Sequence, residues 1–513
     1  MTTPLVLVAG AGPTGMTAAI ELKRAGMNVR IVDKSSQMAQ HSQALVVQAR
    51  TLEQFQRYGI ASAAVDRGHK ITKAHLWSEG ERILSFSLED IPSRYPYALM
   101  LPQSETEKIL NQCMESLGVT TERGTELLSL AQPEGLVSAV LRHSSGKQEQ
   151  LNPEWVIGCD GAHSAVRSKL DIPFEGGGVA LSFFLGDLEL DGPDVPGDEL
   201  SVHLHHGDVV FMARLPNKLV RLIVAIHSRQ DEELHRDLTL KDFQDAIDNA
   251  GVNVRVRSSD WMTPFRVHDL QARHYRAGSV FLAGDASHIH SPVGGQGMNT
   301  GIQDVANLAW KLAAVARGAS DALLNSYEEE RAAVGRALLR FTERGLKLAT
   351  APNPIIEAIR DNLLPIVSKL QPVQKAMLGF VSETAIEYRS SSIVADHGGD
   401  GNLRAGDRLP DLSFETSDGP STLLRNWTSA SHLAFVLSST TTDSGAKIAA
   451  LRAALPHAEV VPVPAHALDN EGRRLLGTEE KLLIVRPDGY VGFRGPVDTP
   501  THWQAYARQD ALA

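Results

Sequence analysis

A strand, a glycine turn and a helix occupy the first 25 residues and constrain the fold of this chain more than any other segment. Residues 3–9 form a short, mostly β-type apolar run that stops at Gly10-Ala11-Gly12-Pro13-Thr14-Gly15. Apolar residues at 16, 19, 20 and 22 then follow a helical period. Gly10 permits a tight turn, Gly12 lets the backbone approach a pyrophosphate, and Gly15 lets the helix pack on the strand. The pattern predicts a dinucleotide-binding unit whose helix N-terminus faces the anion.

A second apolar run, Val29-Arg30-Ile31-Val32, ends in Asp33, 18 residues after Gly15. A carboxylate at the tip of the second strand can accept hydrogen bonds from an adenosine ribose, and we group the adjacent Lys34 with it. A glycine motif alone often only closes a loop. Here the strand, the helix and the acidic residue all stand at the spacing that a dinucleotide-binding unit requires. The motif alone does not separate NAD from FAD.

Composition limits the class of protein. The chain has 513 residues, of which 42% are hydrophobic and 22% charged, which is typical of a globular protein of about three domains. The net charge of −11 disfavours binding to nucleic acid through a broad basic surface. Two cysteines exclude a disulfide framework and fit a reducing cytoplasm. No apolar run reaches the roughly 18 residues of a membrane-spanning helix, and residues 5–9 lack the basic start of a signal peptide.

Two later strand patterns each end in an aspartate. Residues 155–159 lead into Asp160 and a small-residue turn that reaches Arg167, and residues 279–283 lead into Gly284-Asp285. Such strands point carboxylates at the open end of a parallel sheet, where ligands of α/β folds bind. The segment 291–301 contains Pro292, and its glycines leave backbone amides bare at the start of a helix that continues through 304–316. The alternative interpretation is a loop with helix caps.

In this order and spacing, the three motifs resemble the class A FAD-dependent aromatic hydroxylases with the p-hydroxybenzoate hydroxylase fold. The chain looks closest to the branch of phenol, pentachlorophenol and polyketide hydroxylases. The resemblance implies an α/β fold in which a Rossmann-like FAD-binding domain is interrupted by a β-sheet substrate domain and followed by a thioredoxin-like domain. The expected divisions are 1–75, 97–178 and 266–345 for FAD, 76–96 and 179–265 for substrate, 346–395 for a helical connector, and 396–513 for the thioredoxin-like domain without a CxxC motif.

The resemblance also implies roles for single residues around a non-covalent FAD. Residues 10–15 would hold the pyrophosphate, Asp33 the adenosine ribose and Gln103 the ribityl or phosphate region. Asp160 would serve both FAD and the nicotinamide cofactor, Asp285 the ribityl chain, and residues 297–299 the pyrimidine edge of the flavin. The expected cofactor-binding set is Gly10, Gly12, Pro13, Thr14, Gly15, Asp33, Lys34, Gln103, Asp160, Gly284, Asp285, Pro292, Gly297, Met298 and Asn299.

The region around residue 50 both follows and departs from the family pattern. Arg50-Thr51-Leu52-Glu53 matches the helix that follows the first flavin-contacting loop. The family usually has an arginine seven residues earlier, where this chain has Gln43. A neutral side chain there removes the phosphate contact or flavin steering that an arginine would supply.

The substrate sheet is expected from the alternation in residues 71–86 and 181–226. Six large side chains either line an aromatic pocket or are plain core: Tyr95, Phe183, Phe211, Met212, Trp261 and Phe265. His203, His205 and His206 suggest a metal, but no cysteine or acidic cluster nearby in the sequence completes a site, so we expect none. Arg214 and Arg221 are the only arginines that we note in these strands, which favours a phenol or polycyclic aromatic over a carboxylated ring.

The last third of the chain changes pattern. Residues 353–392 look helical, and 433–437 and 481–493 read as strands, the latter as a hairpin with a Pro-Asp-Gly turn. Thiol chemistry is not expected in this domain because Cys113 and Cys159 lie far upstream. Packing against the rest of the chain, or against a second subunit in a homodimer, is the expected role.

The resemblance implies an NAD(P)H-dependent aromatic monooxygenase that acts through a flavin C4a-hydroperoxide formed with O2 and attacks an electron-rich ring. The single dinucleotide motif is taken by FAD, so NADH or NADPH would bind transiently. No catalytic base is identified; His203, His205 and Tyr97 are candidates, each also explained by structure. The alternatives are a flavin epoxidase, a Baeyer-Villiger oxygenase or a reductase on the same fold, or a non-catalytic flavin-binding redox sensor.

Overall fold

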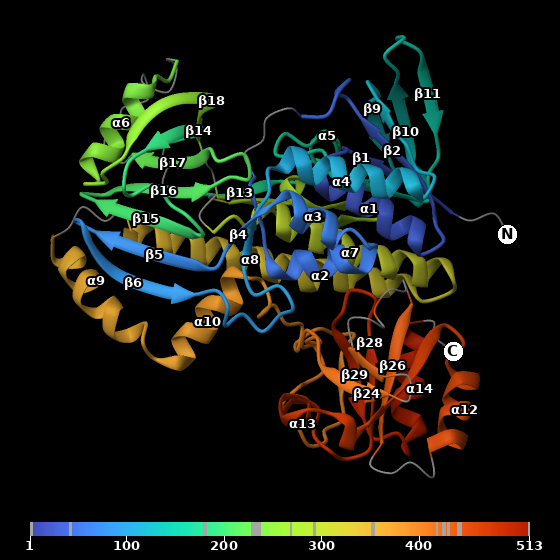
Figure 1. Cartoon of the computed structure of the whole chain (residues 1–513). Helices are drawn as coiled ribbons and strands as arrows, with labels where there is room; N and C mark the ends of the chain where they lie inside the picture. The colour runs from blue at the N-terminus through green and yellow to red at the C-terminus, as the bar shows by residue number, and fades with distance from the viewer. Residues whose placement is uncertain are drawn as a thin grey trace.

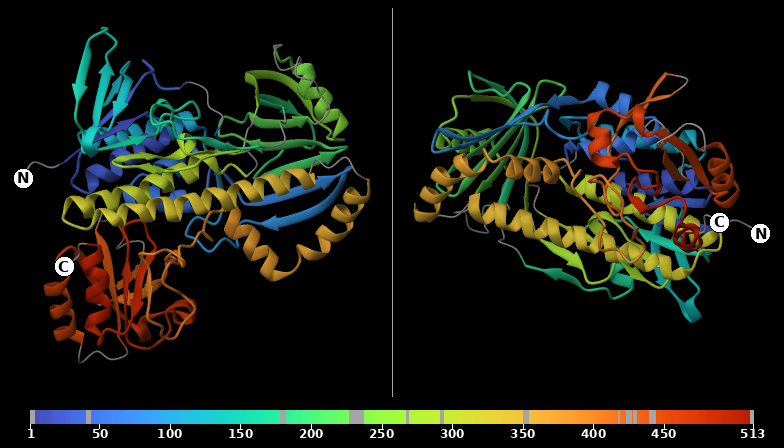
Figure 2. Two further views of the ribbon diagram at one scale, coloured as in Figure 1. Left: turned by 180° about the vertical axis from the view of Figure 1, so that it is seen from behind. Right: turned by 90° about the horizontal axis from the view of Figure 1, so that it is seen from below.

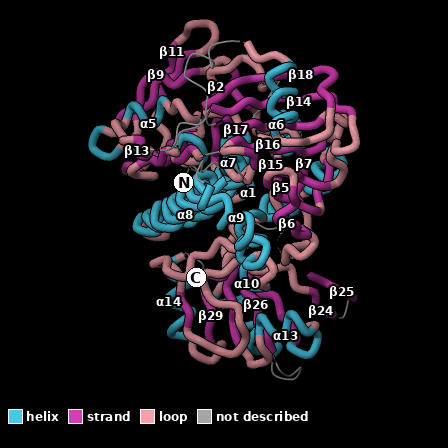
Figure 3. Tube along the Cα trace, turned by 90° about the vertical axis from the view of Figure 1, so that its left-hand side faces the viewer, coloured by secondary structure: helices cyan, strands magenta, loops and turns pink. Residues whose placement is uncertain are grey.

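The structure is a computed structural model that describes residues 4–39, 44–177, 182–226, 237–266, 269–290, 294–349, 354–416, 419–422, 427, 431–438 and 444–510. Two large sheets lie side by side, and a separate C-terminal domain lies on the other side of the long helix α8 (Figures 1 and 3). Among the described residues, no helix combines the length and apolar character needed to cross a membrane.

The first sheet has six strands in the order β20-β21-β12-β1-β2-β8. Its centre is β1 (Leu5–Ala9), parallel to β2 (Asn28–Asp33) on one side and to β12 (Trp155–Gly158) on the other, with β21 (Val280–Leu282) parallel to β12. All four strands match runs predicted from the sequence. Because they are parallel, their carboxyl ends meet at one edge. The remaining strands are β8 (Thr121–Arg123) and β20 (Arg276–Ala277).

Four helices pack on this sheet: α1 (Pro13–Arg24), α4 (Gln103–Ser116), α5 (Ala165–Lys169) and α7 (Gly297–Ala316). Helices α1 and α7 are buried almost all round because other elements cover the sides that face away from the sheet. Helix α7 begins seven residues before the amphipathic run from 304 that we predicted. Small strands and helices complete this domain: α2 (Ala49–Tyr58), α3 (Ala61–Arg67), β3 (Val46–Val47), β4 (His69–Ile71), β7 (Ala98–Met100), β9 (Glu126–Ala131), β10 (Ser138–Arg142), β11 (Gln148–Leu151), β13 (Phe174–Gly176), β19 (Leu270–Ala272) and β22 (His288–Ile289).

The second sheet has seven strands in the order β18-β14-β17-β16-β15-β5-β6. Helix α6 (Leu240–Asn249) packs on one face through Phe243 and Ile247, which join a core with Phe184 and Met212. Six of these strands lie in the segments where alternation was predicted from the sequence: β5 (Lys73–Ser78), β6 (Glu81–Ser87), β14 (Ser182–Asp191), β15 (Glu199–His205), β16 (Asp208–Arg214) and β17 (Val220–Ile226). The seventh strand, β18 (Arg255–Arg266), lies outside those segments.

Three helices come next in the chain. Helix α8 (Asn325–Ala349) runs along both sheets, as Figure 2 shows from behind, and α9 (Pro354–Val367) and α10 (Gln371–Val381) follow it. Our expectation of helix through residue 392 is wrong beyond α10. The helix ends because Glu383 adopts a left-handed backbone with φ of 60°, which a helix cannot continue through.

The C-terminal domain has a five-stranded sheet in the order β23-β29-β28-β26-β27. The predicted hairpin is confirmed, because β28 (Lys481–Val485) pairs antiparallel with β29 (Val491–Gly495). The predicted strand 433–437 lies within β26 (His432–Ser438). The other elements are β23 (Ala395–Asp396), β24 (Ser413–Thr416), β25 (Gly419–Thr422), β27 (Ala458–Pro464), α12 (Ser444–Ala454), α13 (Asn470–Leu476) and α14 (Pro500–Gln509).

A buried ionic network joins this domain to the domain that contains the six-stranded sheet. Arg486, at the end of β28, pairs with Glu330 of α8 at 2.6 Å and with Asp488 in its own turn. Arg408 pairs with Glu53 of α2 at 2.8 Å. Burial opposes the charge on Glu330, but Arg486 and Lys311 hold the pKa of that carboxyl well below its usual value. Each domain therefore supplies the counter-charges that the other needs.

Candidate functional site

The glycine turn after β1 has the space that an anion needs. A Cβ at Gly10, where φ is 99°, would lie 2.3 Å from the carbonyl oxygen of Cys159, and one at Gly15 would lie 1.9 Å from the carbonyl oxygen of Gly10. A Cβ at Gly12 would meet no atom within 4 Å. Gly12 is also the N-cap of α1, where no side chain caps the helix and Pro13 follows. The first amides of α1 therefore face open space.

Thr14 ties this turn to the third motif. A Cβ at Gly284 would lie 2.7 Å from Thr14 Oγ1, and one at Gly301 of α7 would lie 2.5 Å from the same atom. Both glycines are thus required by close packing on Thr14. The contact brings the start of α1, the end of β21 and the first turns of α7 together.

Asp33 is the last residue of β2 and lies at the same edge of the sheet. Its Oδ2 accepts a hydrogen bond from the Ala11 amide at 2.7 Å, and its Oδ1 accepts one from the Ser35 amide at 2.8 Å. The carboxylate is half-buried, and each oxygen keeps a further lone pair for a ligand hydroxyl. Lys34 is exposed.

Gln103 is the first residue of α4, and its side chain is engaged within the protein. Its Nε2 donates to Glu107 Oε1 at 2.8 Å, and its backbone N–H donates to the carbonyl of Ala44 at 3.1 Å. Burial raises the pKa of the Glu107 carboxyl. The side chain oxygen of Gln103 is the atom left for a ligand.

Asp160 has a structural role at the start of α5. Its carboxylate accepts hydrogen bonds from Ser164 Oγ at 2.5 Å and from the amides of Ala165 and Val166, and so caps α5. Arg167 then donates to the carbonyl of Ala286 at 2.9 Å, which joins the second motif to the third. This is the helix-capped loop that we kept as the alternative. A direct contact between Asp160 and a cofactor stays a prediction.

Asp285 presents a carboxylate at the sheet edge. Its side chain is exposed while Gly284 and Ala286 on either side are buried. No described residue donates a hydrogen bond to it. The surrounding protein still raises the pKa of the Asp285 carboxyl by desolvation, so the group lies in a recess rather than on an open surface.

A second aspartate, which the sequence reasoning missed, holds this turn. Asp304 of α7 is fully buried, and its Oδ2 accepts from the Gly284 amide at 3.0 Å and lies 2.9 Å from His288 Nε2. Its Oδ1 accepts from Arg331 Nε of α8 at 2.7 Å. Burial opposes its charge, but Arg331 and His288 hold the pKa of Asp304 below its usual value. A charged residue on the buried face of an apolar helix was the signal available in the sequence.

The start of α7 offers backbone amides. Asn299 Oδ1 accepts from the Gln48 amide at 2.9 Å, and its Nδ2 donates to the carbonyls of Val46 and Gly295. The Asn299 side chain is thereby used within the protein. The amides of residues 297–299, which include Gly297 and Met298, have no intrahelical acceptor and are the groups left for a ligand. Pro292 and Gln43 lie outside the described residues.

Arg50 belongs to the domain interface. Its guanidinium is fully buried, pairs with Glu53 at 2.7 Å and donates to the carbonyl of Asp488 at 2.6 Å. It also lies 5.2 Å from the ring of Trp427 and 5.1 Å from that of Tyr490. Arg50 therefore orients the C-terminal domain rather than a cofactor phosphate.

The large side chains of the second sheet do not form one pocket. Met212 is buried beneath α6, and Tyr95 is buried and donates to Gln56 Oε1 at 2.6 Å, so both are core. Phe183 stacks on Phe265 at 5.2 Å on the face away from α6. Phe211 and Trp261 are half-buried.

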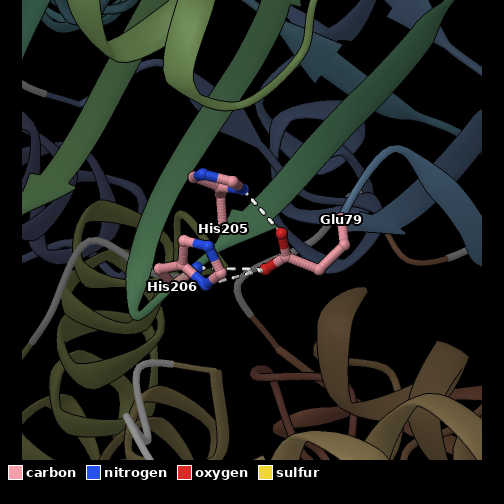
Figure 4. Close-up of side chains that lie close together, drawn as sticks. All are labelled: Glu79, His205 and His206. Atoms are coloured by element: carbon pink, nitrogen blue, oxygen red, sulfur yellow. Dashed lines mark hydrogen bonds and ion pairs between the residues drawn. The ribbon is translucent and has the colours of Figure 1, made fainter.

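The three histidines separate into two environments. His203 stacks on Trp77 at 5.8 Å, and burial lowers its pKa to about 4. His205 and His206 lie at an exposed turn with Glu79, and His205 Nδ1 is 2.7 Å from a carboxylate oxygen of Glu79 (Figure 4). The structure thus supplies an acidic neighbour that the sequence did not reveal. These three groups could hold a metal ion, but the ion pair already accounts for their positions.

Comparison with known proteins decides the family. The FAD binding domain family matches residues 3–342, and the family described as aromatic-ring hydroxylase, C-terminal, matches residues 402–512. This chain belongs to the FAD-dependent aromatic hydroxylases. It is a flavoprotein monooxygenase by membership, and FAD is its cofactor.

Individual relatives of this hydroxylase match between 80% and 99% of its length. The 6-methylpretetramide 4-monooxygenase of Streptomyces rimosus is 32% identical over 96% of this chain and 91% of that protein. The pentachlorophenol 4-monooxygenase of Sphingobium chlorophenolicum is 33% identical over 80% of this chain and 76% of that protein. The structure of the OxyS anhydrotetracycline hydroxylase from S. rimosus aligns with a TM-score of 0.82 at 28% identity, over 99% of both chains.

Proposed function

We propose that this hydroxylase oxygenates a phenolic or polycyclic aromatic compound, with NADH or NADPH as reductant and O2 as the source of oxygen. One observation carries the proposal: the open approach at Gly12 and the exposed carboxylate of Asp285 meet at one sheet edge beside bare amides of α7. Two relatives are named for their action on 6-methylpretetramide and on pentachlorophenol, and these names support the substrate class.

The residues at this edge fit the parts of FAD. The amides that follow Gly12 suit the pyrophosphate, because a helix N-terminus attracts an anion and no atom fills the approach. Asp33 keeps lone pairs for the adenosine ribose. Asp285, which accepts no hydrogen bond from the described residues, suits the ribityl hydroxyls. The amides of residues 297–299 suit the carbonyl oxygens of the flavin ring.

When bound, the flavin supplies the redox chemistry that places an oxygen atom on an aromatic ring. The chain must hold that ring and keep water away. We propose that the face of the second sheet opposite α6 contributes to this wall, since Phe183, Phe265 and Ile223 form an apolar cluster there.

The base that would deprotonate a phenol stays unassigned. With a pKa of about 4, His203 is neutral near pH 7 and binds a proton too weakly to take one from a phenol. Burial raises the pKa of Tyr97, so its hydroxyl stays protonated and acts as a hydrogen-bond donor. His205 lies at the exposed turn with Glu79. The structure therefore supports none of the three candidates from the sequence as the catalytic base.

The cofactor part of the proposal is tested with Gly12→Val. A Cβ at Gly12 meets nothing within 4 Å, so the variant folds, but its branched side chain occupies the path of the pyrophosphate. Gly445→Val is the matched control, because a Cβ there also meets nothing and the site lies in the C-terminal domain. We expect loss of the yellow flavin absorbance in Gly12→Val alone. A fully flavinated Gly12→Val protein would show that this turn does not bind the cofactor.

The reaction is tested with a panel of phenols and polyketide aromatics. We expect some to accelerate NADH or NADPH oxidation, with O2 uptake matched by a product that is one oxygen atom heavier and carries a new ring hydroxyl. A product with an epoxide or an inserted ester oxygen would favour the epoxidase or Baeyer-Villiger alternative. Reduction without oxygen uptake would indicate a reductase, and no stimulation by any compound would favour a redox sensor.

A further inference from the structure

Two hairpin turns lie side by side at one edge of the second sheet. Strands β5 and β15 are parallel neighbours with Ser78 opposite Leu204, so both strands end at the same edge. Each then turns back at once, β5 into β6 and β15 into β16. The backbone N–H of Glu79 donates to the carbonyl of Leu204 at 3.1 Å, which continues the strand pairing into the turns. The sheet therefore fixes the position of one turn against the other.

Three side chains that can bind a metal meet at these turns. Glu79 comes from the first turn and His205 and His206 from the second, and one ligand atom of each lies within 4.8 Å of the other two (Figure 4). Among the residues that the structure describes, this is the one such group of three. No metal is expected from the sequence, because Glu79 lies 127 residues before His206 and only the fold brings the two together.

The carboxylate of Glu79 faces both imidazoles. Its Oε2 lies 2.7 Å from His205 Nδ1, and its Oε1 lies 3.7 Å from His206 Nδ1. The backbone N–H of His206 also donates to Oε1 at 3.1 Å and so orients the carboxylate. The ligand atoms of one tetrahedral ion, with bonds of about 2.0–2.2 Å, lie roughly 3.4 Å apart. Small rotations of the three side chains therefore suffice to bring these atoms onto one ion.

The backbone of both turns favours residues other than those present. Glu79 and His206 are left-handed, with φ of 47° and 45°, and each precedes a glycine that also has positive φ. Hairpin turns of this kind prefer asparagine, aspartate or glycine at the first central position. Both positions instead carry a member of the cluster. The turn does not explain this choice of residues, whereas a shared ligand does.

The ion pair between His205 and Glu79 organises these groups for a metal. The contact needs a proton at Nδ1, and a metal ion takes the place of that proton between the same two side chains. Two imidazoles and one carboxylate suit Zn²⁺ and the other late divalent transition metals, whereas Mg²⁺ and Ca²⁺ prefer oxygen ligands. Glu79 and His206 are exposed, so water reaches the site and supplies the remaining ligand.

We propose that Glu79, His205 and His206 bind a divalent transition-metal ion such as Zn²⁺. The ion clips together the two chain segments of the second sheet, because β5 and β6 come from residues 73–87 and the other five strands from residues 182–266. In the order of the strands, β15 and β5 form the junction between these segments. The inference does not rest on the proposed function, since it uses no residue of the edge assigned to FAD.

The test is calorimetric titration with ZnCl2 of the FAD-loaded protein, made without a histidine tag and freed of metals with a chelator. Glu79→Gln, His205→Ala and His206→Asn each remove one ligand, and asparagine suits the left-handed backbone at position 206. His274→Ala is the matched control, because it also removes a histidine that pairs with a glutamate, in this case Glu328 at 3.3 Å, outside the cluster. Melting temperatures with and without Zn²⁺ provide a second measurement.

We expect the wild type and His274→Ala to bind one Zn²⁺ with equal affinity, and each cluster variant to bind it more weakly by about tenfold or more. Zn²⁺ should raise the melting temperature of the wild type and of His274→Ala but not of the cluster variants. Equal Zn²⁺ affinity in all variants, no Zn²⁺ binding by the wild type, or Mg²⁺ binding as tight as Zn²⁺ binding would overturn the site. Zn²⁺ binding without a rise in melting temperature would overturn the clip between the two segments.

Discussion

Replacing Asp304 by alanine should affect both the stability of the chain and its affinity for FAD. The carboxylate is fully buried between Arg331, His288 and the Gly284 amide. Removing it leaves the fully buried guanidinium of Arg331 without its counter-charge, and breaking a buried ion pair in this way costs about 3–5 kcal/mol. The Gly284 amide loses its acceptor as well. Urea unfolding of the FAD-free protein measures the first effect.

The effect of Asp304→Ala on FAD affinity follows from the position of Asp304 beside the Gly284 turn. The lost hydrogen bond holds the turn that carries Asp285, so we expect FAD affinity to fall by at least tenfold, measured by titration of the apoprotein followed by flavin fluorescence. Asp304→Asn keeps an oxygen for the Gly284 amide and should retain more FAD affinity than Asp304→Ala.

Asp510→Ala is the matched control, because Asp510 forms a comparable buried contact with His432 at 3.2 Å inside the C-terminal domain. It should lower stability without changing FAD affinity. If Asp304→Ala destabilises the chain but binds FAD as the wild type does, Asp304 is a packing residue and our argument about the Gly284 turn is wrong.

Four further predictions follow from other sites. Asp285→Ala should weaken FAD binding by about 1.5–3 kcal/mol, the value of a charge-assisted hydrogen bond, and unchanged FAD retention would contradict the assignment. The raised pKa of Glu383, about 8, means that the contribution of Glu383 to stability is greatest below its usual pKa near 4.5 and is lost, at up to about 1.4 kcal/mol per pH unit, as the pH rises toward 8; Glu383→Gln should remove this part of the pH dependence in urea unfolding. Replacing Cys113 and Cys159 by alanine should leave turnover intact, because burial raises the pKa of both thiols, and loss of turnover in the folded, flavinated variant would point to thiol chemistry. Truncation near Gly401 should lower the melting temperature because it uncovers apolar surface, and an unchanged melting temperature would mean that the C-terminal region serves a partner instead.

The parallel sheet could be predicted because its evidence is local. The strands at 5–9, 28–33, 155–158 and 280–282 are short apolar runs that each end in a glycine or an acidic residue, so the period and the turn chemistry agree. Their parallel alignment then places Gly10, Asp33 and Asp285 at one edge without further information.

The contacts that hold this edge could not be predicted in the same way. Asp304 and Arg331 lie 27 residues apart on different helices, and Gln48 meets Asn299 across 251 residues. Sequence period shows which face of a helix is buried, but not which polar group on that face meets which partner. Asp160 shows the converse, since a carboxylate after a strand can cap the next helix as readily as it can bind a ligand.

The pairing of Arg486 with Glu330 has a consequence for biosynthesis. The ribosome completes α8 at Ala349, 137 residues before Arg486, in a chain that is made at roughly 5–20 residues per second. During that interval the Glu330 carboxylate can pair with Lys311 of α7 but not with Arg486, so part of the positive charge that it faces in the folded protein is missing. The contact surface of α8 must therefore remain open on the nascent chain, where a chaperone can reach it, and it closes only after the C-terminal hairpin has been translated.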